Sequence, residues 1–274
     1  MAVTMAEITK LRKMTGAGMM DCKNALTEAE GDMDKAMEII RKKGQAVAAK
    51  RSDREAGEGC VLAKADGDYA AVIALKCETD FVAKNVDFVA LAREILDLTV
   101  ANRCKTLDEV KNLPYGNATV AQAVTDRSGI TGEKMELDGF GYVEAPVTSS
   151  YIHAGNRLAV VAGFNKEIPA ELAHGVAMQI AAMNPLAVTP EKVDPAIVAR
   201  EKEIAADKAR EEGKPENMIE KIAMGRLGKF YKEVCLLQQE YVCNDEKKPV
   251  GDILKAVDKD LTVTDFRRYT LNAE

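Results

Sequence analysis

The feature that most constrains the fold of this chain is an order of hydrophobic patterns that occurs twice. In the first occurrence, two apolar runs of strand length, residues 60–65 and 69–77, flank residues 66–68, an Asp-Gly-Asp sequence typical of a hairpin turn. A helical pattern of apolar residues follows over about 82–100. We therefore expect two strands and a helix in succession.

The same order returns in the second half of the chain. Residues 143–153 and 157–164 predict a second hairpin, and an apolar helix is expected over about 169–183. A shift of 88 residues places Phe88 on Val176 without a gap. The repetition predicts an α+β fold in which two related subdomains pack together.

The first 44 residues carry a helical pattern throughout. Gly16 and Gly31 interrupt it, and Asp32 is a suitable N-cap for a third helix that would end at Gly44. We expect a three-helix module, which would be marginally stable alone because so little surface can be buried.

A basic stretch, residues 41–54, follows this module. It holds six Lys and Arg residues against Asp53. One interpretation is a contact with RNA or the ribosome. We favour a solvated linker because no aromatic residue is interleaved with the charges.

Residues 188–234 are rich in charges of both signs and carry two sparse apolar stripes on either side of Gly213. We expect an antiparallel helical hairpin that protrudes from the core. After it, residues 236–242 and 263–271 are strand candidates and 250–257 a short helix. These patterns divide the chain into 1–54, 55–141 and 142–274, with the hairpin as an insertion in the last.

The composition argues against nucleic acids and membranes. The chain has 38 Lys and Arg against 44 Asp and Glu, a net charge of −6, and aromatic residues are 5% with no Trp. A nucleic-acid binder needs a basic face and often a stacking platform. The longest apolar run has seven residues, 69–75, where a membrane span needs roughly 20. No export signal is visible, so we expect a cytoplasmic protein without direct nucleic-acid specificity.

The signatures of enzymes and metal sites are missing. The six cysteines form no Cys-x-x-Cys pair, and neither they nor His153 and His174 have the spacing of a zinc site. We expect reduced thiols. No P-loop, Gly-x-Ser-x-Gly or Gly-x-Gly-x-x-Gly sequence occurs. The sequence therefore favours a binding protein with no resident metal or cofactor.

Four blocks, in order, carry a resemblance to a known family. Residues 11–23 (LRKMTGAGMMDCK) and 77–85 (CETDFVAKN) resemble two signatures of the bacterial elongation factor Ts family, and residues 151–157 and 213–230 are similar to its later blocks. The resemblance implies guanine-nucleotide exchange on elongation factor Tu, a protein GTPase, without covalent chemistry. It also implies a ubiquitin-associated-like N-terminal module, two core subdomains and a coiled-coil hairpin. Two roles stay open for the hairpin: proximity to the ribosome, or binding of the partner in a larger assembly.

Thr79, Asp80 and Phe81 lie where a predicted strand passes into a predicted helix. From the residues alone, the plainer interpretation is an N-cap at Thr79 or Asp80, with Phe81 packed in the first turn. The resemblance implies instead that Asp80 and Phe81 press into the partner's nucleotide-binding domain near its magnesium and phosphates. On the same resemblance, the contact is completed by Val82, Ala83 and Lys84.

The resemblance places two further parts against the partner. One is the N-terminal module, with Leu11, Met19 and Met20, although Leu11 suits a helical core and Met20 suits it better than Met19. The other is His153, a secondary contact, whereas His174 on an apolar helix is expected to be structural. Some members continue into a C-terminal helix that touches the partner; the present sequence ends at Glu274, so we do not expect that contact.

Three other functions compete with this one. An adaptor would hold its partner through residues 1–50 alone. An RNA-binding protein would use residues 41–54 and depend steeply on salt. An enzyme would use Asp80 or Glu78, but neither has a companion His or set of metal ligands in the sequence.

Overall fold

The computed structural model describes residues 3–271, whose main feature is a pair of antiparallel three-stranded sheets. The first has the order β1-β2-β5, with strands Glu58–Asp66, Tyr69–Cys77 and Met135–Glu144. The second has the order β6-β7-β8, with strands Val147–Ile152, Leu158–Phe164 and Val263–Thr270. In each sheet the second strand of a hairpin is central, and the third strand comes from much later in the chain.

The two central strands are buried on both faces. Every residue of β7 and all but one of β2 are buried. One face of each sheet packs on helices, and the other packs on the opposite sheet through small residues such as Ala70 and Val161. A Cβ atom at Gly163 would lie 2.6 Å from Val143, so the sheets approach closely. The unbroken apolar run 69–75 is therefore a strand with no solvent-exposed face.

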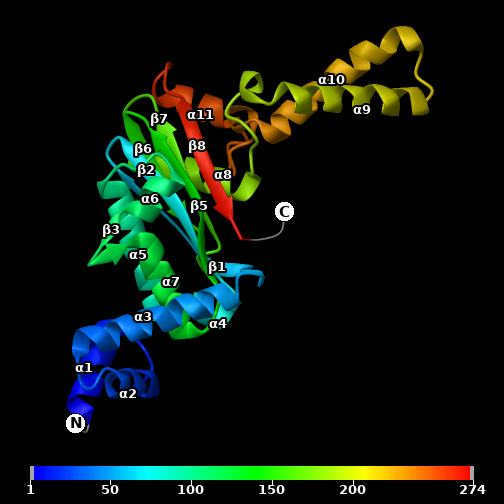
Figure 1. The fold of residues 1–274 in the computed structure, drawn as a ribbon. Helices are drawn as coiled ribbons and strands as arrows, with labels where there is room; N and C mark the ends of the chain where they lie inside the picture. The colour runs from blue at the N-terminus through cyan, green and yellow to red at the C-terminus, as the bar shows by residue number, and fades with distance from the viewer. Residues whose placement is uncertain (1–2, 272–274) are drawn as a thin grey trace.

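Helices cover the two outer faces. Over the first sheet lie α5 (Val86–Ala101), α6 (Leu107–Asn112) and α7 (Val120–Thr131), with the short strands β3 (Pro114–Tyr115) and β4 (Ala118–Thr119) between the last two. Over the second lie α8 (Ala170–Met183) and α11 (Val250–Val257). Figure 1 shows α5 on one side of the strands and α8 on the other, so the centre of the molecule is a helix–sheet–sheet–helix stack.

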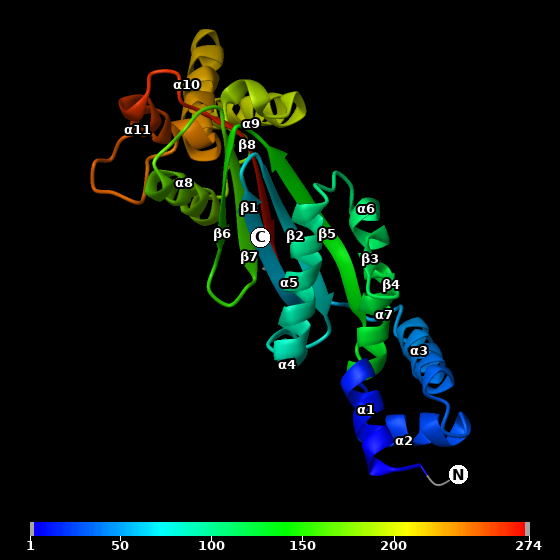
Figure 2. The same ribbon diagram turned by 90° about the vertical axis from the view of Figure 1, so that its left-hand side faces the viewer.

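The N-terminal module consists of α1 (Met5–Thr15), α2 (Met19–Glu28) and α3 (Met33–Lys50). Thr4 and Glu7 form a capping box at the start of α1, and the Asp32 side chain caps α3. α3 crosses α7 so closely that a Cβ atom at Gly129 would lie 2.2 Å from the Gly44 Cα. Figures 1 and 2 place the module at one end of the molecule.

A helical hairpin extends from the other end (Figure 1). It consists of α9 (Pro195–Glu211) and α10 (Glu216–Val234), with the 3-10 helices η1 (Pro190–Lys192) and η2 (Leu236–Gln238) at its base. Its buried side chains are few, and those of α9 are both alanines. The two helices therefore lie close together while most of their surface faces solvent.

The predicted α+β fold is confirmed, two local predictions are wrong, and one strand was not predicted. α3 continues through Gly44 to Lys50, where it packs on α7 at Gly129, whose missing side chain lets the two helices approach closely; residues 41–50 are thus helix and not linker. Residues 135–144 form the unpredicted strand β5, whose Gly139 lies where the second sheet approaches. Residues 236–242 form η2 and an isolated bridge instead of a strand.

Within residues 3–271, no helix combines the length and the apolar character that crossing a bilayer requires. Residues 272–274, at the chain end where the contact of a C-terminal helix was considered, lie outside the described residues. The domain boundaries expected after residues 54 and 141 stay predictions.

Candidate functional site

The corner between β2 and α5 contains a separate single-turn helix, α4 (Asp80–Ala83). The Thr79 side chain caps α4 by accepting from the Val82 N–H, at 3.5 Å. The Asn85 side chain then caps α5, accepting from the backbone of Asp87 at 2.9 Å. Two successive caps around one turn explain why the predicted helix over 82–100 is divided here.

Phe81 points into solvent from α4. Its exposed fraction is 84%, so the interpretation of this side chain as a packed staple is wrong. Val86, at the start of α5, is 81% exposed. Two such exposed side chains within six residues are an unusual use of apolar surface, because large apolar side chains are normally buried. Val86 was not among the residues predicted from the sequence; its place at the start of the apolar helix was the available signal.

The side chains that follow Phe81 anchor the turn. Val82 and Ala83 are half-buried and pack against the core of the first sheet and its helices. Phe81 therefore stands on a turn whose opposite side is fixed to the core. We call residues 79–86 the tip.

The tip carries an ion pair. Lys84 Nζ lies 2.6 Å from Asp80 Oδ2, and both side chains are largely exposed. The hydrogen bond from Lys84 lowers the pKa of the Asp80 carboxyl, which is ionised at neutral pH. The tip thus presents an aromatic ring beside a carboxylate and an ammonium group.

Two glutamates hold the residues before Phe81. Glu133, between α7 and β5, accepts hydrogen bonds from the Thr79 backbone N–H at 3.1 Å and from the Thr79 hydroxyl at 2.6 Å. Glu78 accepts from the Lys134 backbone N–H at 2.6 Å and from Arg51, whose Nη1 lies 2.8 and 2.9 Å from its two oxygens. The Lys134 hydrogen bond, followed by Arg51, lowers the pKa of Glu78. No sequence signal joins these residues, because they are far apart in the chain.

The N-terminal module exposes methionines beside the same end of the molecule. Met19 is 40% and Met20 64% exposed, so the expectation that Met20 belongs to the core is wrong. Leu11 is fully buried among the three helices. Its side chain cannot touch another protein in this conformation, and the exposed contact candidates here are Met19 and Met20. Figure 2 shows α4 and the module at the same end of the molecule.

His153 lies at the turn after β6 and is exposed. Its Nδ1 is 2.9 Å from the hydroxyl of Tyr151, and His174 of α8 meets the edge of the Tyr151 ring with centroids 5.6 Å apart. Both histidines of the chain thus contact one tyrosine. Both histidines are exposed, and the structural role expected of His174 stays a prediction that its edge contact with the Tyr151 ring supports.

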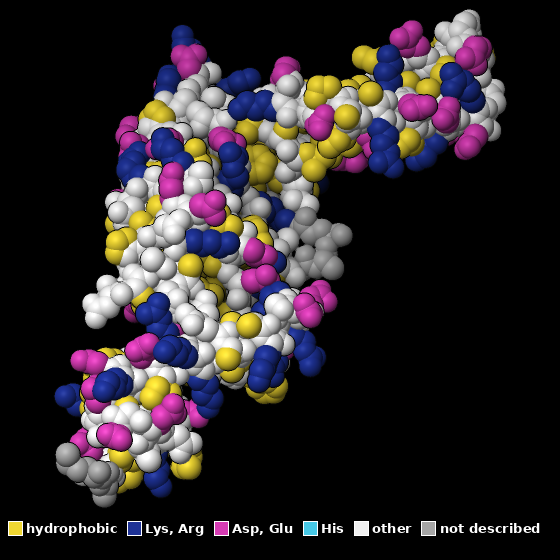
Figure 3. All heavy atoms as spheres, in the orientation of Figure 1, with side chains coloured by type: hydrophobic (Ala, Val, Ile, Leu, Met, Phe, Trp, Pro, Cys, Tyr) yellow, Lys and Arg dark blue, Asp and Glu magenta, His cyan; other side chains and the backbone are white. Residues whose placement is uncertain are grey.

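The basic stretch 41–54 is largely engaged within the chain. Four of its basic side chains have polar partners, three of them elsewhere in the chain and one, that of Lys42, within α3. The pairs are Arg41 with Gln122, Lys42 with Glu38, Lys43 with Asp21 and Arg51 with Glu78. In Figure 3 basic and acidic side chains are interspersed over this end of the molecule. This arrangement weakens the RNA-binding alternative, which needs unpaired basic groups.

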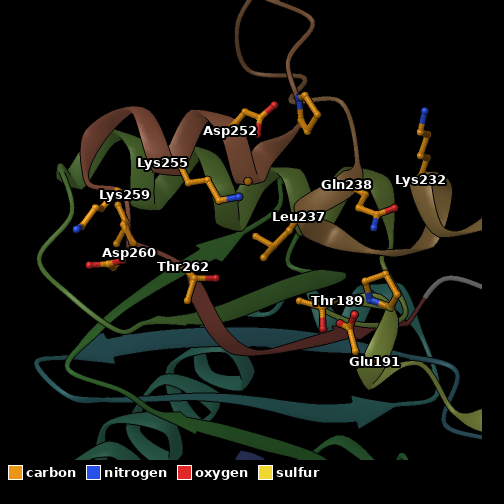
Figure 4. A pocket seen from close by; sticks show the side chains of 14 residues that line it. Thr189, Glu191, Lys232, Leu237, Gln238, Asp252, Lys255, Lys259, Asp260 and Thr262 are labelled. Atoms are coloured by element: carbon orange, nitrogen blue, oxygen red, sulfur yellow. The ribbon is translucent and has the colours of Figure 1, made fainter. Parts of the chain in front are cut away.

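A pocket of about 440 Å³ lies far from the tip, at the base of the hairpin. Figure 4 shows Lys255 and Leu237 pointing into it, with Glu191 and Asp260 at its borders. Its charges have both signs and are spread over several elements. Among residues 3–271, no group of three His, Cys, Asp or Glu side chains could hold a metal ion.

Comparison with known proteins identifies the family. The family model described as "Elongation factor TS" matches residues 78–273. Elongation factor Ts of Phocaeicola vulgatus is 57% identical, and that of Bacteroides thetaiotaomicron 56% identical, each with all of both chains covered. Elongation factor Ts of Porphyromonas gingivalis is 56% identical over 275 residues, again covering both chains completely. The chain therefore belongs to the elongation factor Ts family.

Proposed function

We propose that this protein is a guanine-nucleotide exchange factor of translation elongation, which acts in the cytoplasm by binding elongation factor Tu with GDP and promoting GDP release. The family membership supports the reaction and the partner. The observation that carries the mechanism is the 84% exposure of Phe81 at the end of a capped, anchored turn.

Phe81 is suited to act as a wedge. An aromatic ring offers a large apolar area with only two torsions to immobilise on binding. Magnesium in the partner's nucleotide site needs near-octahedral oxygen geometry, so a small displacement of one ligand weakens both the ion and the phosphates it holds. Asp80 and Lys84, paired beside the ring, contribute polar contacts at its border. The turn that carries the ring is capped by Thr79 and anchored to the core by Val82 and Ala83.

Exchange of this kind needs no covalent step and no cofactor of the factor's own. The factor binds the nucleotide-free partner more tightly than the nucleotide-bound partner, and by linkage the nucleotide weakens the factor by the same ratio. Rebinding of GTP then expels the factor. The protein accelerates an equilibrium whose direction is set by the nucleotide concentrations.

The secondary contacts belong to other elements. Met19 and Met20 supply exposed, adaptable apolar surface on the N-terminal module, at the same end of the molecule as the tip. His153 adds a surface contact from the second sheet. The hairpin α9–α10, at the opposite end, is the part available to approach the ribosome.

The test is the release of fluorescent GDP from purified elongation factor Tu. We expect the intact chain to accelerate release, and Phe81→Ala to slow the accelerated rate about 30-fold or more, since an aromatic hot spot is worth about 2 kcal/mol or more. Glu167→Ala, at the exposed corner between β7 and α8, is the matched control and should act like the intact chain. No acceleration by the intact chain, or equal rates with Phe81→Ala, contradicts the proposal.

A further inference from the structure

Thr79 is held by Glu133 in a way that fixes the start of α4. The carboxylate accepts both the backbone N–H and the hydroxyl proton of Thr79, at 3.1 and 2.6 Å. Because a hydroxyl has one proton and two lone pairs, giving that proton to Glu133 turns a lone pair toward the Val82 N–H, which it caps. Hydrogen bonds to an ionised acceptor are among the stronger ones in proteins.

Glu133 is itself placed by the end of α7. Gly132 ends that helix in the left-handed conformation, with φ of 74°, and the Glu133 backbone N–H donates to the Thr131 hydroxyl at 3.3 Å. The orientation of α4 therefore follows the orientation of α7.

The residue before Thr79 is tied to the N-terminal module. Arg51 directly follows α3, and its guanidinium holds the Glu78 carboxylate, which is the less exposed partner at 15% against 38%. Glu78 also accepts from the backbone of Lys134, next to Glu133. α3 in turn packs on α7 at the contact of Gly44 with Gly129. These contacts form a closed circuit of α3, α7, residues 133–134 and residues 78–79.

We infer that Glu133 is a positioning residue for the Phe81 wedge, and that the Arg51–Glu78 pair sets the tip relative to the N-terminal module that carries Met19 and Met20. The inference rests on the proposed function of Phe81. It assigns Glu133, Glu78 and Arg51 no contact with the partner. They hold the N-terminal module and the tip in one fixed geometry. Docking of the module on the partner therefore sets the direction of the Phe81 ring.

The experiment separates the maximal rate of GDP release at saturating factor from the factor concentration that gives half of it. Glu133→Gln cannot accept both Thr79 hydrogen bonds, because one carboxylate oxygen becomes an amide donor. We expect it to lower the maximal rate about tenfold, within the range for hydrogen bonds to charged groups, while the half-maximal concentration changes less than twofold. Glu136→Gln is the matched control, since Glu136 pairs with Lys134 without touching the tip, and it should leave both values unchanged.

A double-mutant comparison distinguishes positioning from general stability. If Glu133 acts through the ring, Glu133→Gln has no further effect in the Phe81→Ala background. Thr79→Val keeps the shape of the side chain and removes the hydroxyl that donates to Glu133. It should therefore lower the maximal rate of GDP release as Glu133→Gln does. Arg51→Ala should slow release about threefold, as expected for a partly exposed ion pair, and Arg51→Lys should restore most of the rate.

Three results overturn the inference. In one, Glu133→Gln and Thr79→Val both release GDP at the rate of the intact chain. In another, Glu133→Gln lowers the rate by the same factor with and without Phe81. In the third, Phe81→Ala is itself without effect; the proposed function then fails together with the inference, whereas the first two results leave the proposed function standing.

Discussion

Each half of the core has a corner where its second strand passes into a helix, from β2 to α5 in the first half and from β7 to α8 in the second. The two halves use this corner differently. In the first half, residues 78–79 are bonded to residues 133–134, the segment that leads into the third strand β5. In the second half, the Asn165 side chain donates to the Asp260 carbonyl at 2.7 Å and accepts from the Thr262 N–H at 2.8 Å, in the segment that leads into β8. In both halves, therefore, hydrogen bonds fix this corner to the segment that leads into the third strand.

The difference lies in what the corner presents. The first corner adds the extra turn α4 and an exposed aromatic ring, whereas the second, residues 165–169, is a plain loop whose Lys166 pairs with Asp258. The fold supplies this corner twice, and among the described residues of the two corners the large exposed hydrophobic side chains, Phe81 and Val86, belong to the first. Function in this molecule is an addition to a repeated scaffold.

The largest expected effect concerns the repeated core. Phe88 on α5 and Val176 on α8 are equivalent positions and are both almost fully buried. Phe88→Ala should lower the free energy of unfolding by about 3–5 kcal/mol, and Val176→Ala by about 2 kcal/mol, because the cavity left behind is larger in the first case. Urea denaturation followed by circular dichroism measures both values. Equal losses of unfolding free energy in the two variants would show that Phe88 and Val176 are not packed equivalently in their two cores.

Thiol chemistry gives the next contrast. Cys243, in the second half, is exposed, while burial raises the pKa of Cys60 to about 11 and that of Cys77 to about 12. At pH 8 the thiolate fraction of Cys60 is on the order of 0.1%, so it should react with a water-soluble thiol reagent at least about 100-fold more slowly than Cys243. The rate at Cys60 should rise about tenfold per pH unit below its pKa.

Stopped-flow labelling of the native protein measures these rates. Cys243→Ser should remove the fast phase and leave the slow ones unchanged. A fast phase that persists in this variant would contradict the burial of the other five cysteines.

A smaller effect is expected where the first half carries its additional module. Gly129→Ala would place a Cβ atom 2.2 Å from Gly44 and force α3 away from α7, whereas Gly44→Ala meets only ordinary contacts near 3.5 Å. We expect Gly129→Ala to destabilise docking of the module by about 1–3 kcal/mol. Gly44→Ala should be neutral or stabilising by up to about 1 kcal/mol, because alanine favours the helix. Hydrogen exchange of α3 amides measures the docking, and equal protection in both variants would contradict the close crossing.

The sequence was sufficient for the repeated hairpin and helix, because strand and helix periods depend on local burial and both halves preserve them. It did not predict β5, the third strand of the first sheet. It was insufficient for α3, where Gly44 lies inside the helix at the contact with Gly129 and does not end the helix. The exposure of Phe81 could not be decided from the residues, since a packed staple and a projecting ring fit the same N-cap pattern. The bond between Glu133 and Thr79 depends on tertiary register, which no spacing in the chain reports.

The central claim is that Phe81 enters the partner protein. The chain contains no tryptophan, so Phe81→Trp labelled with 5-fluorotryptophan provides one aromatic fluorine signal at the tip, and Glu167→Trp provides the matched signal at the second corner. On adding nucleotide-free elongation factor Tu, the signal at position 81 should shift and become protected from a soluble paramagnetic agent, while the signal at 167 stays accessible. A signal at 81 as accessible in the complex as in the free protein would contradict the account.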